Sequence, residues 1–172
     1  TRCSILLDIV RLDGSLVRYT KAQTIKCIKG EIAQYVDTIG ATGTIHNIRC
    51  TQGTIAAKRN EGEMLHLTVD LPRALTLNQA LSRTLQCDLK NTFIDPENYW
   101  EEHEYYRTDH LSIAVRFPRG RPPLSWAAYG KNGPDIVDPM NIQVRLTKRD
   151  GNPCLLFRPK PSRSISSVVI RW

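Results

Sequence analysis

Turn sequences divide this chain into short alternating segments, and this pattern constrains the fold more than any other feature. An alternating apolar segment over residues 4–10 precedes Leu12-Asp13-Gly14-Ser15, and a second one over residues 16–19 follows it. An Asp-Gly pair between two such segments is a strong short-range signal for a β-hairpin. The chain is therefore predicted to open with two antiparallel strands.

The same arrangement recurs at two later places. Each turn sequence stands between two strand-like segments: Asn60-Glu61-Gly62 between residues 54–58 and 64–69, and Asp150-Gly151-Asn152 between residues 142–146 and 154–157. Two further segments, 111–117 and 165–171, alternate or are rich in β-branched residues and are bounded by Pro, Ser or Gly, which predicts strands. Many short strands at near-regular spacing are typical of a sandwich or a barrel.

Two segments are also compatible with helices. Residues 31–36 have the composition of a short helix, and Leu77, Leu81, Leu85 and Leu89 are spaced four apart, although residues 85–89 also alternate as a strand would. The sequence thus predicts an all-β fold, an antiparallel β-sandwich that is Ig-like or related. We expect about 7–10 short strands and at most one or two short helices. No Cys…Trp…Cys framework of the immunoglobulin family is present.

Length and composition predict one core. At 172 residues with 41% hydrophobic residues, residues 1–172 are expected to form a single domain, excised from a larger protein because the chain begins at Thr1 in what reads as a strand. Five cysteines occur without a C-x-x-C pair or an N-x-S/T sequon, which favours a reducing, cytoplasmic compartment. No apolar stretch approaches the roughly 20 residues that span a bilayer, so no membrane span is predicted.

Charge is segregated along the chain. Residues 116–172 carry eleven Lys and Arg against three Asp, whereas residues 88–109 carry seven Asp and Glu against two basic residues. Such adjoining poles of opposite sign can steer a polyanion or an oppositely charged protein face. They predict binding without identifying the partner.

The acidic pole contains the densest aromatic segment, residues 100–110. Trp100, Tyr105, Tyr106 and Arg107 are residue types that dominate binding hot spots, so we predict a protein-recognition surface there. The alternative is a connection whose aromatic side chains pack on the edge of the sandwich.

The same segment contains candidate metal ligands. His103-Glu104-x-x-Arg107 is close to the H-E-x-x-H zinc motif, but a cation stands where the second imidazole must be. His110 lies seven residues after His103, which leaves a metal pair possible. No third ligand is evident, and the prediction remains that the chain carries no metal and no cofactor.

The basic pole contains Pro118-Arg119-Gly120-Arg121-Pro122, which resembles the core of the AT-hook peptide family. The resemblance covers five residues and implies that Arg119 and Arg121 lie along the minor groove of A·T-rich DNA. The structural alternative is an ordered loop, because proline cannot continue a central strand after residue 117. Lys160 and Arg163 in the basic tail would track phosphates, or would simply be solvated.

Motifs for catalysis are absent from the sequence. There is no G-x-S-x-G elbow, no phosphate-binding G-x-x-x-x-G-K-[ST] and no dinucleotide-binding G-x-G-x-x-G unit. The sequence favours a non-catalytic binding, sensing or assembly module that recognises a protein partner or itself. DNA binding through Arg119 and Arg121, and a metal-dependent hydrolase, are the alternatives.

Overall fold

The chain folds as an all-β protein in a computed structural model that describes residues 1–95, 98–103, 108–133, 135–137, 142–159 and 166–172. These residues form fourteen strands and no helix. The strands are β1 (Arg2–Ile9), β2 (Leu16–Lys26), β3 (Glu31–Gly40), β4 (Thr44–Cys50), β5 (Thr54–Glu61), β6 (Met64–Thr76), β7 (Ala80–Lys90), β8 (Tyr99–His103), β9 (His110–Arg116), β10 (Ala127–Asn132), β11 (Asp135–Val137), β12 (Ile142–Arg149), β13 (Asn152–Pro159) and β14 (Ser167–Arg171).

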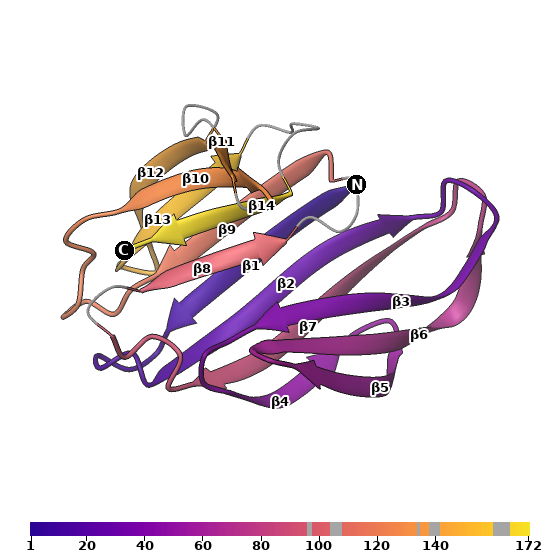
Figure 1. The fold of residues 1–172 in the computed structure, drawn as a ribbon, viewed down its shortest axis with the longest axis horizontal. Coiled ribbons are helices and arrows are strands. Elements are labelled where there is room, and N and C mark those ends of the chain that lie inside the picture. The colour runs from indigo at the N-terminus through magenta and orange to yellow at the C-terminus, as the bar shows by residue number, and fades with distance from the viewer. Residues whose placement is uncertain (96–97, 104–107, 134, 138–141, 160–165) are drawn as a thin grey trace.

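Two layers make up the sandwich (Figure 1). One layer is a seven-stranded sheet in the order β12-β13-β9-β1-β2-β7-β4. The other layer consists of two smaller sheets that cover the same face of the large one, β11-β10-β14-β8 and β3-β6-β5. The predicted sandwich is confirmed, and its fourteen described strands outnumber the expected 7–10. Neighbouring strands are antiparallel, except that β1 and β9 pair in parallel.

The predicted hairpins form β1–β2, β5–β6 and β12–β13, and the two further strands form β9 and β14. In the first turn the Ser15 amide donates to Asp13 Oδ1 at 2.9 Å, and Gly14 adopts a φ of +77°. Only glycine adopts such a φ without steric strain, so the Asp-Gly signal has a direct geometric cause.

The helix expectations are wrong. Residues 31–36 lie in β3, and residues 81–89 lie in β7, which pairs with β2 along its whole length. A spacing of four is also a multiple of two, so Leu81, Leu85 and Leu89 share one face of a strand as readily as one face of a helix. Burial of that face against the small sheets selected the strand.

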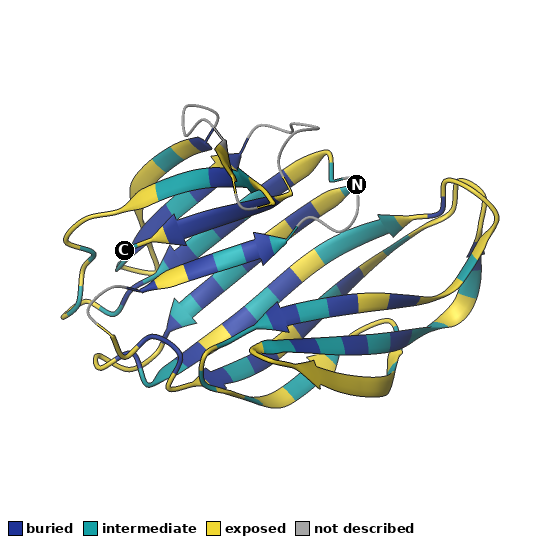
Figure 2. Cartoon of the chain, viewed as in Figure 1, coloured by how far each residue is buried: buried dark blue, intermediate teal, exposed yellow. Residues whose placement is uncertain are grey.

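The core fills the space between the layers, and buried and exposed residues alternate along most strands (Figure 2). Its centre is a set of aromatic rings. Tyr19 of β2 meets Trp100 of β8 with ring centroids 5.3 Å apart, and Phe93 bridges Trp100 and Trp172 at 6.4 and 5.0 Å. These contacts fasten the four-stranded sheet to the large one. Among the described residues no helix has the length and apolar character to cross a membrane.

Candidate functional site at the seam between the small sheets

The two smaller sheets meet at a seam bordered by β3 and β8. Each of these strands is the last of its sheet, β3 pairing only with β6 and β8 only with β14 in the described part of the chain. Figure 1 shows them on either side of β2, which lies behind them in the large sheet. Each side of the seam is therefore bordered by a strand that has one ladder partner within the described residues.

The alternation of backbone hydrogen bonds along β8 identifies the residues whose backbone groups point towards the seam. Asn98 and Trp172, just outside the β8–β14 pair, exchange both backbone hydrogen bonds at 3.3 and 3.1 Å. In an antiparallel pair such positions alternate with positions whose backbone groups point the other way. The backbone groups of Tyr99, Glu101 and His103 are thus directed away from β14 and towards the seam.

The same alternation identifies the residues of β3 whose backbone groups point towards the seam. The Ala41 amide donates to the Glu63 carbonyl at 2.9 Å, which continues the β3–β6 ladder by one hydrogen-bonded position. Counting back by alternation, Val36, Thr38 and Gly40 direct their backbone groups away from β6. These three residues line the seam from its other side.

A groove follows the seam. Its wide end, where β3 ends and β8 begins, has a volume of about 370 Å³. Its narrow part, towards the middle of the seam, has a volume of about 40 Å³. The wide end is lined by carboxylates and aromatic rings, and no Lys or Arg is among its described lining residues. They include Glu63, Asp95, Glu101, Phe93, Tyr99 and Trp100.

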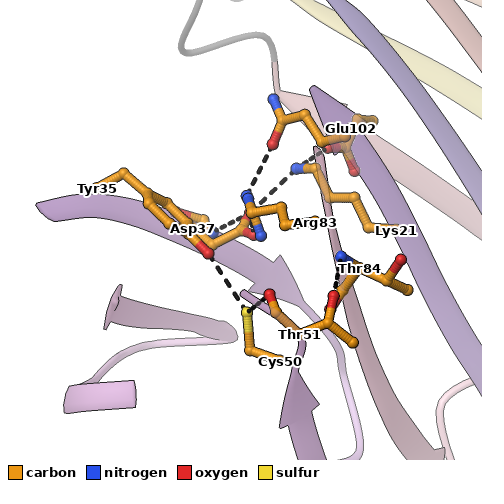
Figure 3. Close-up of polar contacts among 10 residues, drawn as sticks. Lys21, Tyr35, Asp37, Cys50, Thr51, Arg83, Thr84 and Glu102 are labelled. Carbon is orange, nitrogen blue, oxygen red and sulfur yellow. Dashed lines mark hydrogen bonds and ion pairs between the residues drawn. The ribbon is translucent and has the colours of Figure 1, made fainter. Parts of the chain in front are cut away.

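Beneath the middle of the seam lies a buried ion cluster (Figure 3). The Lys21 ammonium on β2 is 3.1 Å from Asp37 Oδ1 on β3 and 2.9 Å from Glu102 Oε1 on β8. Lys21 is 8% exposed and both carboxylates are buried. One ammonium group therefore joins the large sheet to each of the two small sheets.

Arg83 of β7 completes the cluster. Its Nη2 lies 2.5 Å from Asp37 Oδ2 and donates to Gln23 Oε1 at 2.7 Å. Its guanidinium carbon stands 4.0 Å from the centroid of the Tyr35 ring, a cation–π distance. Two cations and two carboxylates thus balance within the buried cluster, which limits the penalty of burying charge.

Burial and pairing set the pKa values of the cluster. Burial lowers the pKa of Lys21, but the attraction of Glu102 and Asp37 outweighs it, so that pKa is raised. Burial raises the pKa of Asp37, but the charges of Lys21 and Arg83 outweigh it, so that pKa is lowered. Both groups are held in their charged forms, which suits a structural clamp and not a general acid or base.

Acid is expected to weaken this clamp. Because the pKa of Asp37 is lower in the folded chain than its ordinary 3.8, its stabilising contribution is complete above that value and is lost as the pH falls below it. Urea unfolding between pH 6 and pH 3 measures this loss. Asp37→Asn, which removes the titrating group, is expected to flatten the acid limb. An unchanged acid limb in this variant would contradict the assignment.

The thiols near the seam are poor nucleophiles. Burial raises the pKa of Cys3, which lines the narrow part of the groove, to about 12, and that of Cys87 also to about 12. A thiol reacts as its thiolate, so neither sulfur is activated.

The predicted acidic aromatic residues are placed in part. Trp100 is 3% exposed and belongs to the core, while it also lines the wide end of the groove. Tyr105, Tyr106 and Arg107 lie outside the described residues. The neighbouring Tyr99 is half exposed on the groove rim.

The R-G-R sequence lies in a loop after β9. Its backbone turns, with the Arg121 amide donating to the Pro118 carbonyl at 3.0 Å. Arg119 is exposed, and Arg121 is partly buried with its guanidinium against Gly14. Lys160 and Arg163 lie outside the described residues, so DNA binding by this face stays a prediction.

The two candidate metal ligands lie in different layers. His103 ends β8 in the four-stranded sheet, and His110 begins β9 in the large sheet. Within the ranges that the structure describes, no three His, Cys, Asp or Glu side chains gather as a metal site would require. Glu104 lies outside those ranges.

Sequence reasoning missed the buried cluster. Its signal was present: Val17, Tyr19 and Lys21 alternate in one strand, so Lys21 continues the inward face. The chain matches no protein-family model and no curated protein. The geometry of the groove therefore carries the functional argument.

Proposed function

We propose that this chain is a non-catalytic binding module that recognises a cationic segment of a partner protein in the seam groove. The observation that carries the proposal is the charge of the groove's wide end. The exposed Glu63 and Asp95 line it in a chain whose formal net charge is +7, together with Glu101, which is paired with Lys131 at 3.1 Å. A concave acidic site on a basic protein selects cations locally, because focused field lines raise their concentration there.

Aromatic side chains support the same reading. Tyr99 is 49% exposed beside the carboxylates, whereas Phe93 and Trp100, which line the same cavity, are 2% and 3% exposed. Aromatic faces attract Lys and Arg, and their apolar bodies cover the alkyl stems of those side chains. The carboxylates and the exposed Tyr99 ring together form a site suited to a basic side chain.

Removing two rim charges is expected to weaken binding of a cationic peptide. Glu63 and Asp95 are both exposed, so Glu63→Gln with Asp95→Asn changes charge with little effect on folding. We expect the dissociation constant of a fluorescein-labelled peptide that alternates lysine with valine to rise about 5–30-fold, because each rim charge contributes modestly. Fluorescence anisotropy at low salt measures it.

The matched control removes two charges elsewhere. Asp135→Asn with Asp150→Asn alters exposed carboxylates on β11 and in the β12–β13 turn, and the isosteric change keeps the shape of each side chain. This variant is expected to bind within about twofold of the unaltered protein. Equal weakening by both double variants would show general charge attraction, and would reject the groove as the site.

A further inference from the structure

The geometry points to a specific binding mode, which rests on the proposed function: the cationic segment enters the seam as an extended β-strand between β8 and β3. Such a strand would join the two small sheets into one continuous layer. Recognition by addition of a strand to an open sheet edge is a general mode of peptide binding, with affinity from backbone hydrogen bonds and selectivity from side-chain pockets.

The outer sheet edges and the seam edges differ in the residues that they expose to an added strand. Natural proteins protect edges with charged residues, bulges or very short strands. The four outer edges, β12, β5, β4 and β11, carry such devices. β4 and β5 each contain a bulge, and β11 is only three residues long. Basic residues lie on β12 (Arg145, Lys148 and Arg149), on β5 (Lys58 and Arg59) and on β4 (Arg49). By contrast, residues 35–40 of β3 and 99–103 of β8 contain no Lys, Arg or Pro. The bulge of β3 lies before this stretch, between Ile32 and Gln34. The difference indicates that these two edges are kept available for pairing.

The positions of the seam-facing backbone groups on the two edges are compatible with one inserted strand. The seam-facing residues on both edges carry side chains on the outer face of the small sheets, Tyr99 and Glu101 on β8 and Val36 and Thr38 on β3. In an antiparallel pair, the two residues that exchange hydrogen bonds lie directly opposite each other and carry their side chains on the same face. In a parallel pair, a residue bonds instead to the two neighbours of the residue opposite, whose side chains lie on the other face. One strand can therefore bond to the seam-facing residues of both edges only if it runs antiparallel to one edge and parallel to the other. Figure 1 shows β8 and β3 running in opposite directions, which is the required arrangement.

The two edges are unequal in one respect. The Thr38 amide already donates to Asp37 Oδ1 at 3.2 Å, so β3 offers fewer free donors than the alternation of its backbone groups alone provides. The β8 edge, with Tyr99 and Glu101, is therefore expected to supply more of the backbone pairing.

Side-chain alternation defines the occupant further. On the outer face, guest side chains lie beside Tyr99, whose ring suits the stem of a Lys or Arg, and beside Glu101, whose carboxylate is shared with Lys131. On the inner face they meet Cys3, Leu111 and the charge-balanced Lys21 cluster. A further charge there would be buried without a partner, so small apolar residues fit. The expected ligand alternates basic with small apolar residues.

A folded second copy is a poorer fit than a free segment. An edge strand of another sandwich is already paired on one side, so it can meet one seam edge and not both. The occupant is therefore an extended segment of a partner protein that is unpaired on both sides.

Peptide N-methylation tests the inserted strand while leaving charge and side chains unchanged. The probe is the peptide alternating lysine with valine, compared with one version N-methylated at every lysine and one at every valine. In the inserted strand one set of amides faces β8 and the other faces β3, so each version is expected to bind about tenfold or more weakly.

The outcomes separate this inference from the proposed function. If both methylated peptides bind as tightly as the parent while Glu63→Gln with Asp95→Asn still weakens it, acidic recognition stands and strand insertion is wrong. If only one of the two methylated peptides binds more weakly than the parent, the strand pairs with one edge, and pairing with both edges is wrong. If the parent peptide does not bind, the proposed function itself fails. A dimer in light scattering that the peptide dissociates would assign the seam to a second copy and overturn the partner segment.

Discussion

Replacing Lys21 with methionine is expected to lower the free energy of unfolding by about 3–5 kcal/mol, the typical loss when one partner of a buried ion pair is removed. Lys21 is 8% exposed, and its ammonium contacts Asp37 and Glu102 at 3.1 and 2.9 Å. Methionine nearly matches the shape of the lysine stem, so packing changes little. The loss would come from leaving Glu102 as a buried carboxylate with no cation beside it among the described residues.

Two comparisons make this measurement specific. Lys131→Met removes an ammonium 3.1 Å from Glu101 in a more exposed pair, and is expected to lower the free energy of unfolding by at most about 1 kcal/mol. Adding Glu102→Gln to Lys21→Met removes the orphaned charge, so the double variant is expected to be more stable than Lys21→Met alone. Denaturant unfolding at neutral pH measures all three. Equal small losses for Lys21→Met and Lys131→Met would contradict a clamp at the seam.

The fold could be predicted in outline because turns and alternation are local signals. Asp13-Gly14 and Asp150-Gly151 fixed hairpins that need no knowledge of the rest of the chain. The division of the second layer into two sheets was not predictable, because it depends on which strands pair over long separations. Residues 77–89 were compatible with both helix and strand, because a period of four satisfies both, and long-range pairing with β2 decides between them.

The candidate site was less accessible to sequence reasoning than the fold. The charge map located an acidic region that includes Glu101, but Glu63 joins the same groove from the β5–β6 turn. The open edges of β3 and β8 consist of backbone groups, which leave no side-chain signature. Their only trace in the sequence is the lack of Lys, Arg and Pro in two strands, which has no meaning until the edges are known.

Gly14→Ala is expected to lower the free energy of unfolding by about 2–4 kcal/mol through two effects that add. Gly14 has a φ of +77°, which strains any residue with a Cβ. A Cβ at this position would also overlap the backbone carbonyl of Phe93 and approach Arg121 Nη1 to 2.5 Å. The β1–β2 turn, the loop after β7 and the R-G-R loop meet here, so the clash must move backbone and not a flexible side chain alone.

Gly62→Ala separates the two effects. Gly62 occupies the corresponding turn of the β5–β6 hairpin with a φ of +58°, yet a Cβ there meets no atom within 4 Å. Its expected loss is about 1–2 kcal/mol, from backbone strain alone. The excess loss in Gly14→Ala then measures the packing of Phe93 and Arg121 on the turn, and thermal unfolding of both variants gives it. If the two glycine variants lose equal stability, the Arg121 loop does not pack on Gly14, and its guanidinium is as free to bind a ligand as the exposed Arg119.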